Sequence, residues 1–257
     1  MTLVIGMRRH RVALLLLLLS MAIGLVVLVV FSRPPTKRQT PLDIDRLRMR
    51  AAAHDVRALS QLELSAGRDD LLAQRALASV LLVEPQADLA AAGMRWARVA
   101  AQRGDAAAQY LLGKALFERN AKGSADRAVA RVWLLRAADQ QHPQAAYLLG
   151  LIYKEGYAIA IDRSQAADWF MRAAALGNAD AMFMLGNAYL EGDGVPRDQN
   201  KALALWRQAA ELEQPLAAQM LSYALRDGAL GLQRDLPQSE QMMVEVEHAL
   251  HHPREVL

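Results

Sequence analysis

Three glycines, Gly186, Gly192 and Gly194, lie close together in the stretch LGNAYLEGDGVPRDQNKALALW, which runs from Leu185 to Trp206. Glycine-rich loops that cradle phosphates with backbone N–H groups are typical of nucleotide-binding enzymes. Such a loop needs a Lys-Ser or Lys-Thr pair after G-x-x-x-x-G, or a G-x-G-x-x-G directly after a strand, and neither pattern occurs here. The glycines are therefore expected to end a helix and to form the loop that follows it.

Other residues that could do chemistry form no catalytic arrangement. The chain has no Cys, which excludes thiolate metal sites, Cys nucleophiles and disulfides. His248, His251 and His252 could place two imidazoles on one helical face, but no carboxylate or Cys motif supports a metal site there. No G-x-S-x-G, S-x-x-K or H-E-x-x-H motif occurs. The sequence therefore predicts a protein that is not an enzyme, with no catalytic, metal or cofactor-binding residues.

The basic charge of the chain belongs to its N-terminal end. The pI is about 9.3, but six of the 30 basic residues lie in residues 1–38, which hold no acidic residue. Residues 39–257 therefore carry 24 basic and 27 acidic side chains. A basic face for nucleic acid is not expected.

The elements that position these residues recur along the chain. The four tryptophans, Trp96, Trp133, Trp169 and Trp206, are spaced by 37, 36 and 37 residues. Ala-Ala pairs and Leu-Gly pairs follow at nearly the same spacing, so the chain contains internal repeats. Ala166, Trp169 and Ala173 fall on one helical face. The unit is predicted to be a helix–turn–helix of about 36 residues.

Capping residues mark the helix starts. Asp105, His142 and Asn178 stand at the short turns of the predicted units, and Pro143 and Pro215 occupy what would be the first helical position. The residues four positions before the Ala that opens each tryptophan helix are also expected to be caps; these are Asp126, Asp162 and Asp198.

This pattern resembles the Sel1-like repeat, a relative of the tetratricopeptide repeat. The consensus letters A-x-x-x-L-G-x-x-Y, G-x-G-V-x-x-D and a following Ala are matched by Ala181, Leu185, Gly186, Tyr189, Gly192, Gly194, Val195, Asp198 and Ala202. The resemblance implies an all-α, right-handed α-solenoid of about four hairpins over residues 90–236. In it, the large Trp fills the space between successive hairpins.

The outer units depart from the consensus. Leu205 takes the Trp position of the fourth unit and Trp206 is displaced by one; Leu116 and Leu225 replace the Tyr, and Ser222 replaces the Gly. Residues 42–89 are predicted to be an N-terminal helical cap or a degenerate repeat. Residues 237–257 are predicted to hold a C-terminal capping helix, beginning at Ser239, and a tail.

The N-terminal end is predicted to anchor the chain in a membrane. After a basic tail at residues 1–11, Val12–Phe31 is an apolar run of 20 residues, which spans about 30 Å at roughly 1.5 Å per residue. A cleaved signal peptide is the alternative. Residues 32–41 form a Pro-rich linker. We expect a single-pass inner-membrane protein with a periplasmic repeat domain, although the Lys and Arg count alone favours a cytoplasmic one.

The resemblance implies a scaffold or adaptor that binds a protein or peptide in its concave groove, with roles in secretion, polymer export, motility or signalling regulation. A cytoplasm-facing adaptor and a cell-wall-related hydrolase are the alternatives, although the Sel1-like proteins that act on such substrates are disulfide-rich. Arginines recur on the tryptophan helices, with one acid among them. They are either ordinary solvated helix surface, which base rates favour, or the lining of a groove that grips an acidic or extended peptide. The predicted partner-binding residues are Arg95, Arg98, Arg131, Arg136, Asp168, Arg172 and Arg207.

Overall fold

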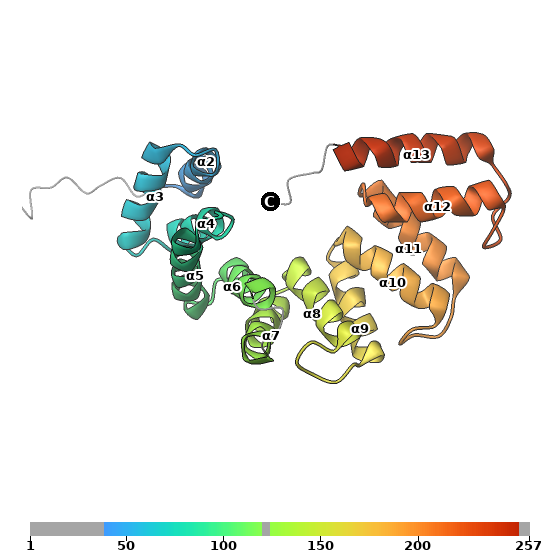
Figure 1. Ribbon diagram of the computed structural model, residues 1–257, viewed down its shortest axis with the longest axis horizontal. Coiled ribbons are helices and arrows are strands. Elements are labelled where there is room, and N and C mark those ends of the chain that lie inside the picture. Colours follow the sequence, from blue (N-terminus) through green and yellow to red (C-terminus); the bar gives the residue numbers. More distant parts are fainter. Residues whose placement is uncertain (1–38, 120–123, 252–257) are drawn as a thin grey trace, which may run out of the picture. The chain divides into compact units, whose positions relative to one another are not determined.

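The computed structural model describes residues 39–119 and 124–251, and these contain twelve helices and no strand (Figure 1). The all-helical prediction is thus confirmed for the described part of the chain. The chain divides into two units between Asp43 and Ile44, and the predicted anchor at residues 12–31 lies outside the described residues. Of the helices described, none is long and apolar enough to cross a membrane.

Two helices, α2 (Pro41–Ala52) and α3 (Val56–Gly67), precede an alternating series. The even-numbered helices of that series are α4 (Leu71–Leu82), α6 (Ala106–Arg119), α8 (Pro143–Glu155), α10 (Ala179–Glu191) and α12 (Pro215–Asp227). The odd-numbered helices are α5 (Ala87–Gln102), α7 (Ser124–Asp139), α9 (Arg163–Ala175), α11 (Gln199–Glu211) and α13 (Leu236–His251), and the first four of them hold one tryptophan each.

Each even helix packs most extensively on the odd helix that follows it, across the longer loop. The sequence suggests a different pairing, in which each odd helix forms a hairpin with the even helix that follows it across the short turn. Contacts across the short turns are also present but fewer. The glycine stretch from Leu185 to Trp206 therefore lies within one closely packed pair, α10 and α11, and is not the seam between two pairs.

Close packing within three of the pairs, α6–α7, α8–α9 and α10–α11, depends on the glycine of the Leu-Gly dipeptide. A Cβ at Gly113 would lie 2.8 Å from Leu134, and one at Gly150 would lie within 3.0 Å of Phe170 ring atoms. A Cβ at Gly186 would lie 2.6 Å from the Trp206 ring. All three distances are too short for a non-bonded carbon contact, so the glycine lets the large side chain rest on the helix backbone.

The tryptophans differ in burial from one repeat to the next. Trp206 is fully buried and Trp169 is 9% exposed, but Trp96 and Trp133 are only half-buried. The deepest position of an odd helix is the residue after the consensus Trp, and Leu134, Phe170 and Trp206 occupy it. The expectation that Trp fills the core is therefore right for the last two tryptophans only.

The loop glycines act as predicted from the sequence, as helix C-caps. Gly156, Gly192 and Gly228 have φ values of 70°, 76° and 64°, in the left-handed region. The backbone N–H of each glycine donates a hydrogen bond to a carbonyl of the last helical turn. The chain then leaves the even helix and reaches the capping aspartate of the next odd helix.

The predicted aspartate caps are confirmed at two of three positions. Asp162 Oδ1 accepts the Gln165 N–H at 2.9 Å, and Asp198 Oδ1 accepts the Lys201 N–H at 3.0 Å. The bond from the Gln165 N–H also holds the pKa of the Asp162 carboxyl below its usual range. Asp126 lies inside the first turn of α7, because that helix begins at Ser124.

The short turns are capped as expected, with Asn178 and His142 as N-caps and Pro143 at the first position of α8. His142 Nδ1 accepts the Ala145 N–H at 3.4 Å. Burial lowers the pKa of His142, which favours the neutral ring that can accept this bond. Ser239 does not start the last helix, because α13 begins at Leu236 and Asp235 caps it.

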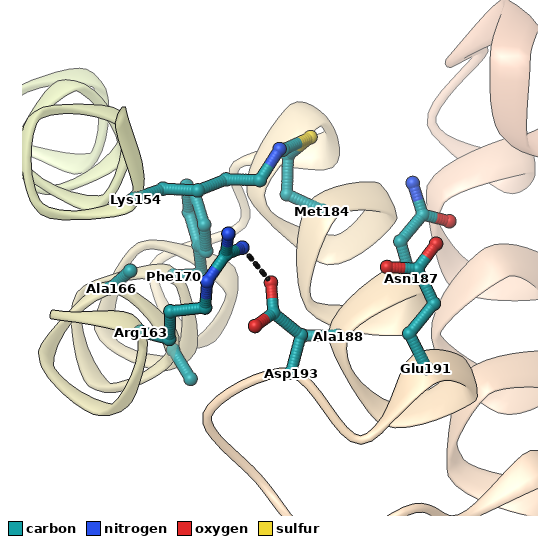
Figure 2. A pocket seen from close by; sticks show the side chains of 10 residues that line it. Lys154, Arg163, Ala166, Phe170, Met184, Asn187, Ala188, Glu191 and Asp193 are labelled. Atoms are coloured by element: carbon teal, nitrogen blue, oxygen red, sulfur yellow. Dashed lines mark hydrogen bonds and ion pairs between the residues drawn. The ribbon is translucent and has the colours of Figure 1, made fainter. Parts of the chain in front are cut away.

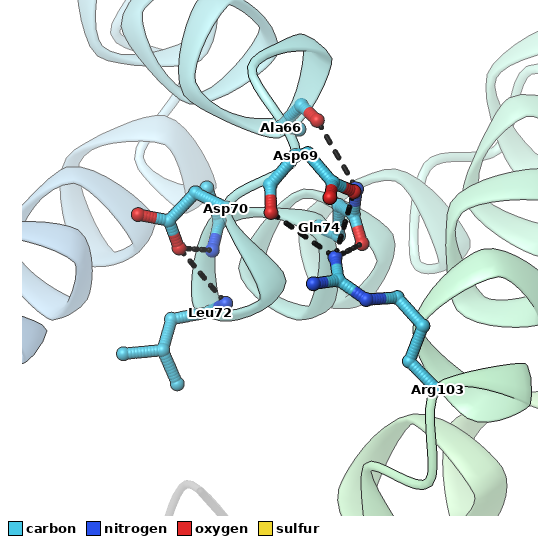
Figure 3. A network of polar contacts seen from close by, with 7 residues as sticks. Ala66, Asp69, Asp70, Leu72, Gln74 and Arg103 are labelled. Atoms are coloured by element: carbon cyan, nitrogen blue, oxygen red, sulfur yellow. Dashed lines mark hydrogen bonds and ion pairs between the residues drawn. The ribbon is translucent and has the colours of Figure 1, made fainter.

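The N-terminal helices continue the same architecture. Arg103, after α5, donates to the Asp69 carboxylate at 2.9 Å and to Gln74 Oε1 at 3.0 Å (Figure 3). Gln74 in turn donates to the Ala66 carbonyl at 3.2 Å. One repeat later Gln109 makes the same bond to the Ala101 carbonyl, at 3.2 Å. The helices before α6 therefore share the turn geometry of the repeats.

Candidate protein-binding face

All seven predicted partner-binding residues lie on four consecutive odd helices. Arg95 and Arg98 are on α5, Arg131 and Arg136 on α7, Asp168 and Arg172 on α9, and Arg207 on α11. Every one except Arg131 is exposed. We call the exposed surface of α5, α7, α9 and α11 the odd-helix face.

Two arginines of this face lie over tryptophan rings. The Arg136 guanidinium lies 4.7 Å from the centre of the Trp133 ring, and that of Arg172 lies 4.5 Å from the centre of the Trp169 ring. Each pair is spaced by three residues on its helix, so the stacking is local. Neither guanidinium has an ion pair among the described residues. Their charge is therefore positioned but not neutralised.

Arg131 lies apart from the others. It is half-buried between α7 and α8, with Nη1 3.5 Å from the Tyr153 hydroxyl, and its Nε is buried with no hydrogen-bond partner in the described part of the chain. The equivalent residues of the next two repeats are Ala167 and Leu203, both buried. The structure thus does not bring Arg131 to the odd-helix face.

The odd-helix face also carries apolar side chains that the sequence analysis did not single out. Val99, Val129, Val132 and Met171 are 38–47% exposed and lie on α5, α7 and α9. Val99 occupies the position at which α7 and α9 carry Arg136 and Arg172. The repeat register could have identified Val99 from the sequence, because it places an apolar side chain where the next two repeats carry exposed arginines.

A polar pocket lies between α8, α9 and α10 (Figure 2). Arg163 Nη1 is 2.7 Å from Asp193 Oδ2 across it, and Lys154 and Glu191 also line it. Its volume of about 80 Å³ falls well below the roughly 300 Å³ at which ligand pockets begin. Its best-placed charges are already paired, so we assign it a structural role in joining the α10–α11 loop to α9.

No metal-binding group of three or more His, Asp or Glu side chains is found within residues 39–119 and 124–251. The exposed residues of the odd-helix face remain the candidate site. They combine guanidinium groups that lie over tryptophan rings with exposed valine and methionine side chains, and interfaces between proteins are enriched in arginine and methionine.

Solved structures that share this fold include the following two. A Sel1 repeat protein from Oxalobacter formigenes matches with a TM-score of 0.73 and 23% identity, over 86% of this chain and 93% of that one. A protective antigen of uropathogenic Escherichia coli strains, which displays an SLR fold, matches with a TM-score of 0.65 and 22% identity, over 81% of this chain. The match covers 46% of that antigen chain, so this protein spans about half of it.

No curated protein sequence matches the chain. The family model described as "Sel1 repeat" matches four consecutive segments, residues 106–142, 143–178, 179–213 and 215–243. Each segment begins with an even helix and continues into the next odd helix, which is the closely packed pair seen in the structure. With more than half of its residues in these four segments, the chain belongs to the Sel1 repeat family.

Proposed function

We propose that the protein is a membrane-anchored scaffold that binds partner proteins through the odd-helix face. Sel1 repeat proteins are protein-interaction scaffolds, and their fold is typically non-catalytic. The observation that carries the proposal is the composition of this face. Arg136 and Arg172 are fixed on tryptophan rings with no ion pair among the described residues, and exposed Val132 and Met171 lie on the same two helices.

This arrangement favours a partner with acidic and apolar side chains. A stacked guanidinium loses little conformational freedom when it binds a carboxylate, because its orientation is already set. The neighbouring valine and methionine side chains would bury apolar area in the same contact. Residues of both kinds on successive helices fit an extended segment that crosses several repeats.

The charge-reversal variant Arg136→Glu/Arg172→Glu is expected to recover at least about tenfold less partner. It replaces two positive charges with negative ones that repel an acidic partner, and a few such residues carry most of the binding energy of an interface. The measurement is affinity purification of the tagged full chain from membranes of its native host, with quantitative mass spectrometry. The control is Arg226→Glu, since Arg226 also lies over an aromatic ring, Tyr223 at 4.9 Å, but is on the even helix α12 and pairs with Asp227. Equal partner recovery with both variants would contradict the proposal.

The anchor at residues 12–31 and the periplasmic site of the repeats are also proposals. They rest on the length of the apolar run and on Arg8, Arg9 and Arg11 directly before it. A bacterial envelope role in secretion, polymer export, motility or signalling regulation would follow from this placement.

Alkaline phosphatase fused after Leu257 is expected to be active, because the enzyme folds only on the periplasmic side and the repeats would carry it there. The measurement is phosphatase activity of intact cells, with the cytoplasm-active reporter β-galactosidase fused at the same point as the control. An active β-galactosidase fusion with an inactive phosphatase fusion would instead place the repeats in the cytoplasm, as the Lys and Arg count favours.

A further inference from the structure

We propose that a cavity between α11, α12 and α13 binds one aromatic side chain of a partner protein. This inference rests on the scaffold function proposed above and adds the kind of residue that the partner must supply. The cavity has a volume of about 310 Å³, and its apolar lining includes Leu221 and Leu225 of α12, Leu232 of the loop and Met242 of α13. Pockets that hold small ligands begin at roughly this volume.

The positions that line the cavity have equivalents in the preceding repeats. The N–H of the capping Asp162 donates to the Tyr153 carbonyl at 2.9 Å, and Asp198 donates to Tyr189 at 2.8 Å. In the last repeat Asp235 donates in the same way to the Leu225 carbonyl, at 3.0 Å. Leu225 therefore occupies the position that holds a tyrosine in the two repeats before it.

The capping aspartates also identify the residues equivalent to Met242, which also lines the cavity. Seven residues after Asp162 is Trp169, and seven residues after Asp198 is Leu205, whereas seven residues after Asp235 is Met242. The two positions hold Tyr153 with Trp169 in one repeat and Tyr189 with Leu205 in the next, and all four side chains pack in the main core cluster. Only the last repeat combines two aliphatic side chains, Leu225 and Met242.

The cavity is thus the space left by a missing aromatic ring. Leucine and methionine are shorter than tyrosine and tryptophan, so the last repeat leaves a volume that the earlier repeats fill from within the chain. An aromatic side chain from another protein restores the same packing, and the flexible Met242 thioether adapts readily to a ring.

The rim of the cavity carries one charge of each sign. Arg207 and Glu211 lie four residues apart on α11, and both are exposed. Neither has an ion pair among the described residues. Because the rim carries one positive and one negative charge, it attracts neither a cationic nor an anionic side chain. A neutral phenyl, phenol or indole ring is therefore the expected occupant.

The binding test uses N-acetyl-L-tryptophanamide as the probe and the full chain in mild detergent, with methyl-labelled methionine. The Met242 methyl resonance is expected to shift with a Kd in the low millimolar range, as is usual for a fragment of this size. N-acetyl-L-alaninamide, which lacks the ring, is expected to leave the resonance unchanged. No shift with the tryptophan probe, or an equal shift with both, would overturn the proposal.

The substitution Leu225→Tyr tests where the probe binds. It supplies the ring that Tyr153 and Tyr189 supply in earlier repeats, so it should fill the cavity and abolish probe binding while the far-UV circular dichroism stays the same. The matched variant Leu225→Ile keeps the volume open and should bind the probe as the parent chain does. Probe binding that survives Leu225→Tyr would overturn the proposal.

Partner recovery from membranes separates this inference from the scaffold function. Leu225→Tyr should lower recovery of the partner, and Leu225→Ile should not. Normal recovery with Leu225→Tyr, together with loss in Arg136→Glu/Arg172→Glu, would overturn the aromatic pocket and leave the odd-helix face in place. Probe binding lost in Leu225→Tyr, with unchanged recovery in the arginine variant, would support the pocket and remove the face.

Discussion

Replacing Gly194 with alanine is expected to lower the free energy of unfolding by about 3 kcal/mol or more, because a new side chain would collide with a helix backbone. A Cβ at Gly194 would lie 2.0 Å from the carbonyl oxygen of Arg163, the first residue of α9, and 2.9 Å from the Ser164 nitrogen. The φ of Gly194 is +77°, which adds a smaller strain of about 1 kcal/mol for a residue with a Cβ.

The control is Gly177→Ala. Gly177 also has a positive φ, +84°, but a Cβ there would meet nothing within 4 Å. It should therefore cost only the backbone term of about 1 kcal/mol. Thermal melting of the full chain, followed by far-UV circular dichroism, would show the difference. The equivalent position of the loop between α8 and α9 holds Ala158, with a φ of 59°. A residue with a Cβ therefore tolerates the left-handed backbone at this position of the loop. Equal losses at both glycines would mean that α9 moves aside without cost.

The two loop glycines have different roles, and the sequence reveals only one of them. Gly192 is recognisable as a helix C-cap from its place after a helical repeat pattern. The need for glycine at position 194 arises from the neighbouring repeat, because the loop packs on the start of α9 and Asp193 pairs with Arg163. A contact between repeats leaves no trace in the local pattern of one loop.

The pairing of the helices also could not be predicted from spacing. The repeat period identifies two kinds of helix and their caps, since Asp162, Asp198 and Asn178 stand at fixed offsets. The sequence favours pairing across the short turn because those helices are nearest in the chain. In the structure the helices that flank the longer loop pack most extensively, because Gly150 and Gly186 allow Phe170 and Trp206 to rest directly on a helix backbone.

The candidate binding face was partly predictable. Helical register places Arg136 and Arg172 on one exposed face, and the structure shows both there. Register also suggested Arg131, but that side chain is half-buried beside Tyr153. Its position depends on how closely α8 approaches α7, which a one-dimensional pattern does not contain. The cavity beside Leu225 and Met242 follows from comparing repeats, but only after the structure shows which positions meet.

Replacing Trp206 with alanine is expected to lower the free energy of unfolding by about 3–5 kcal/mol, the usual loss for a large buried aromatic side chain. Trp206 is fully buried, and its Nε1 donates to Asn187 Oδ1 at 3.1 Å. Trp206→Phe should cost only about 1–2 kcal/mol, because Phe170 fills the equivalent position one repeat earlier and the main loss is the bond to Asn187. Trp169→Ala should cost less than Trp206→Ala, since Trp169 is 9% exposed and Arg172 covers its ring.

Gly186 provides the internal check on this contact. A Cβ at Gly186 would lie 2.6 Å from the Trp206 ring, so Gly186→Ala alone should destabilise the chain by about 1–3 kcal/mol through overpacking. In the Trp206→Ala background the space is empty and the same change should cost little, which gives a clear interaction energy in a double-mutant cycle. Thermal melting of the four chains measures it. Additive losses would mean that α10 and α11 do not depend on the approach of the indole to Gly186, and the packing argument for the Leu-Gly position would fail.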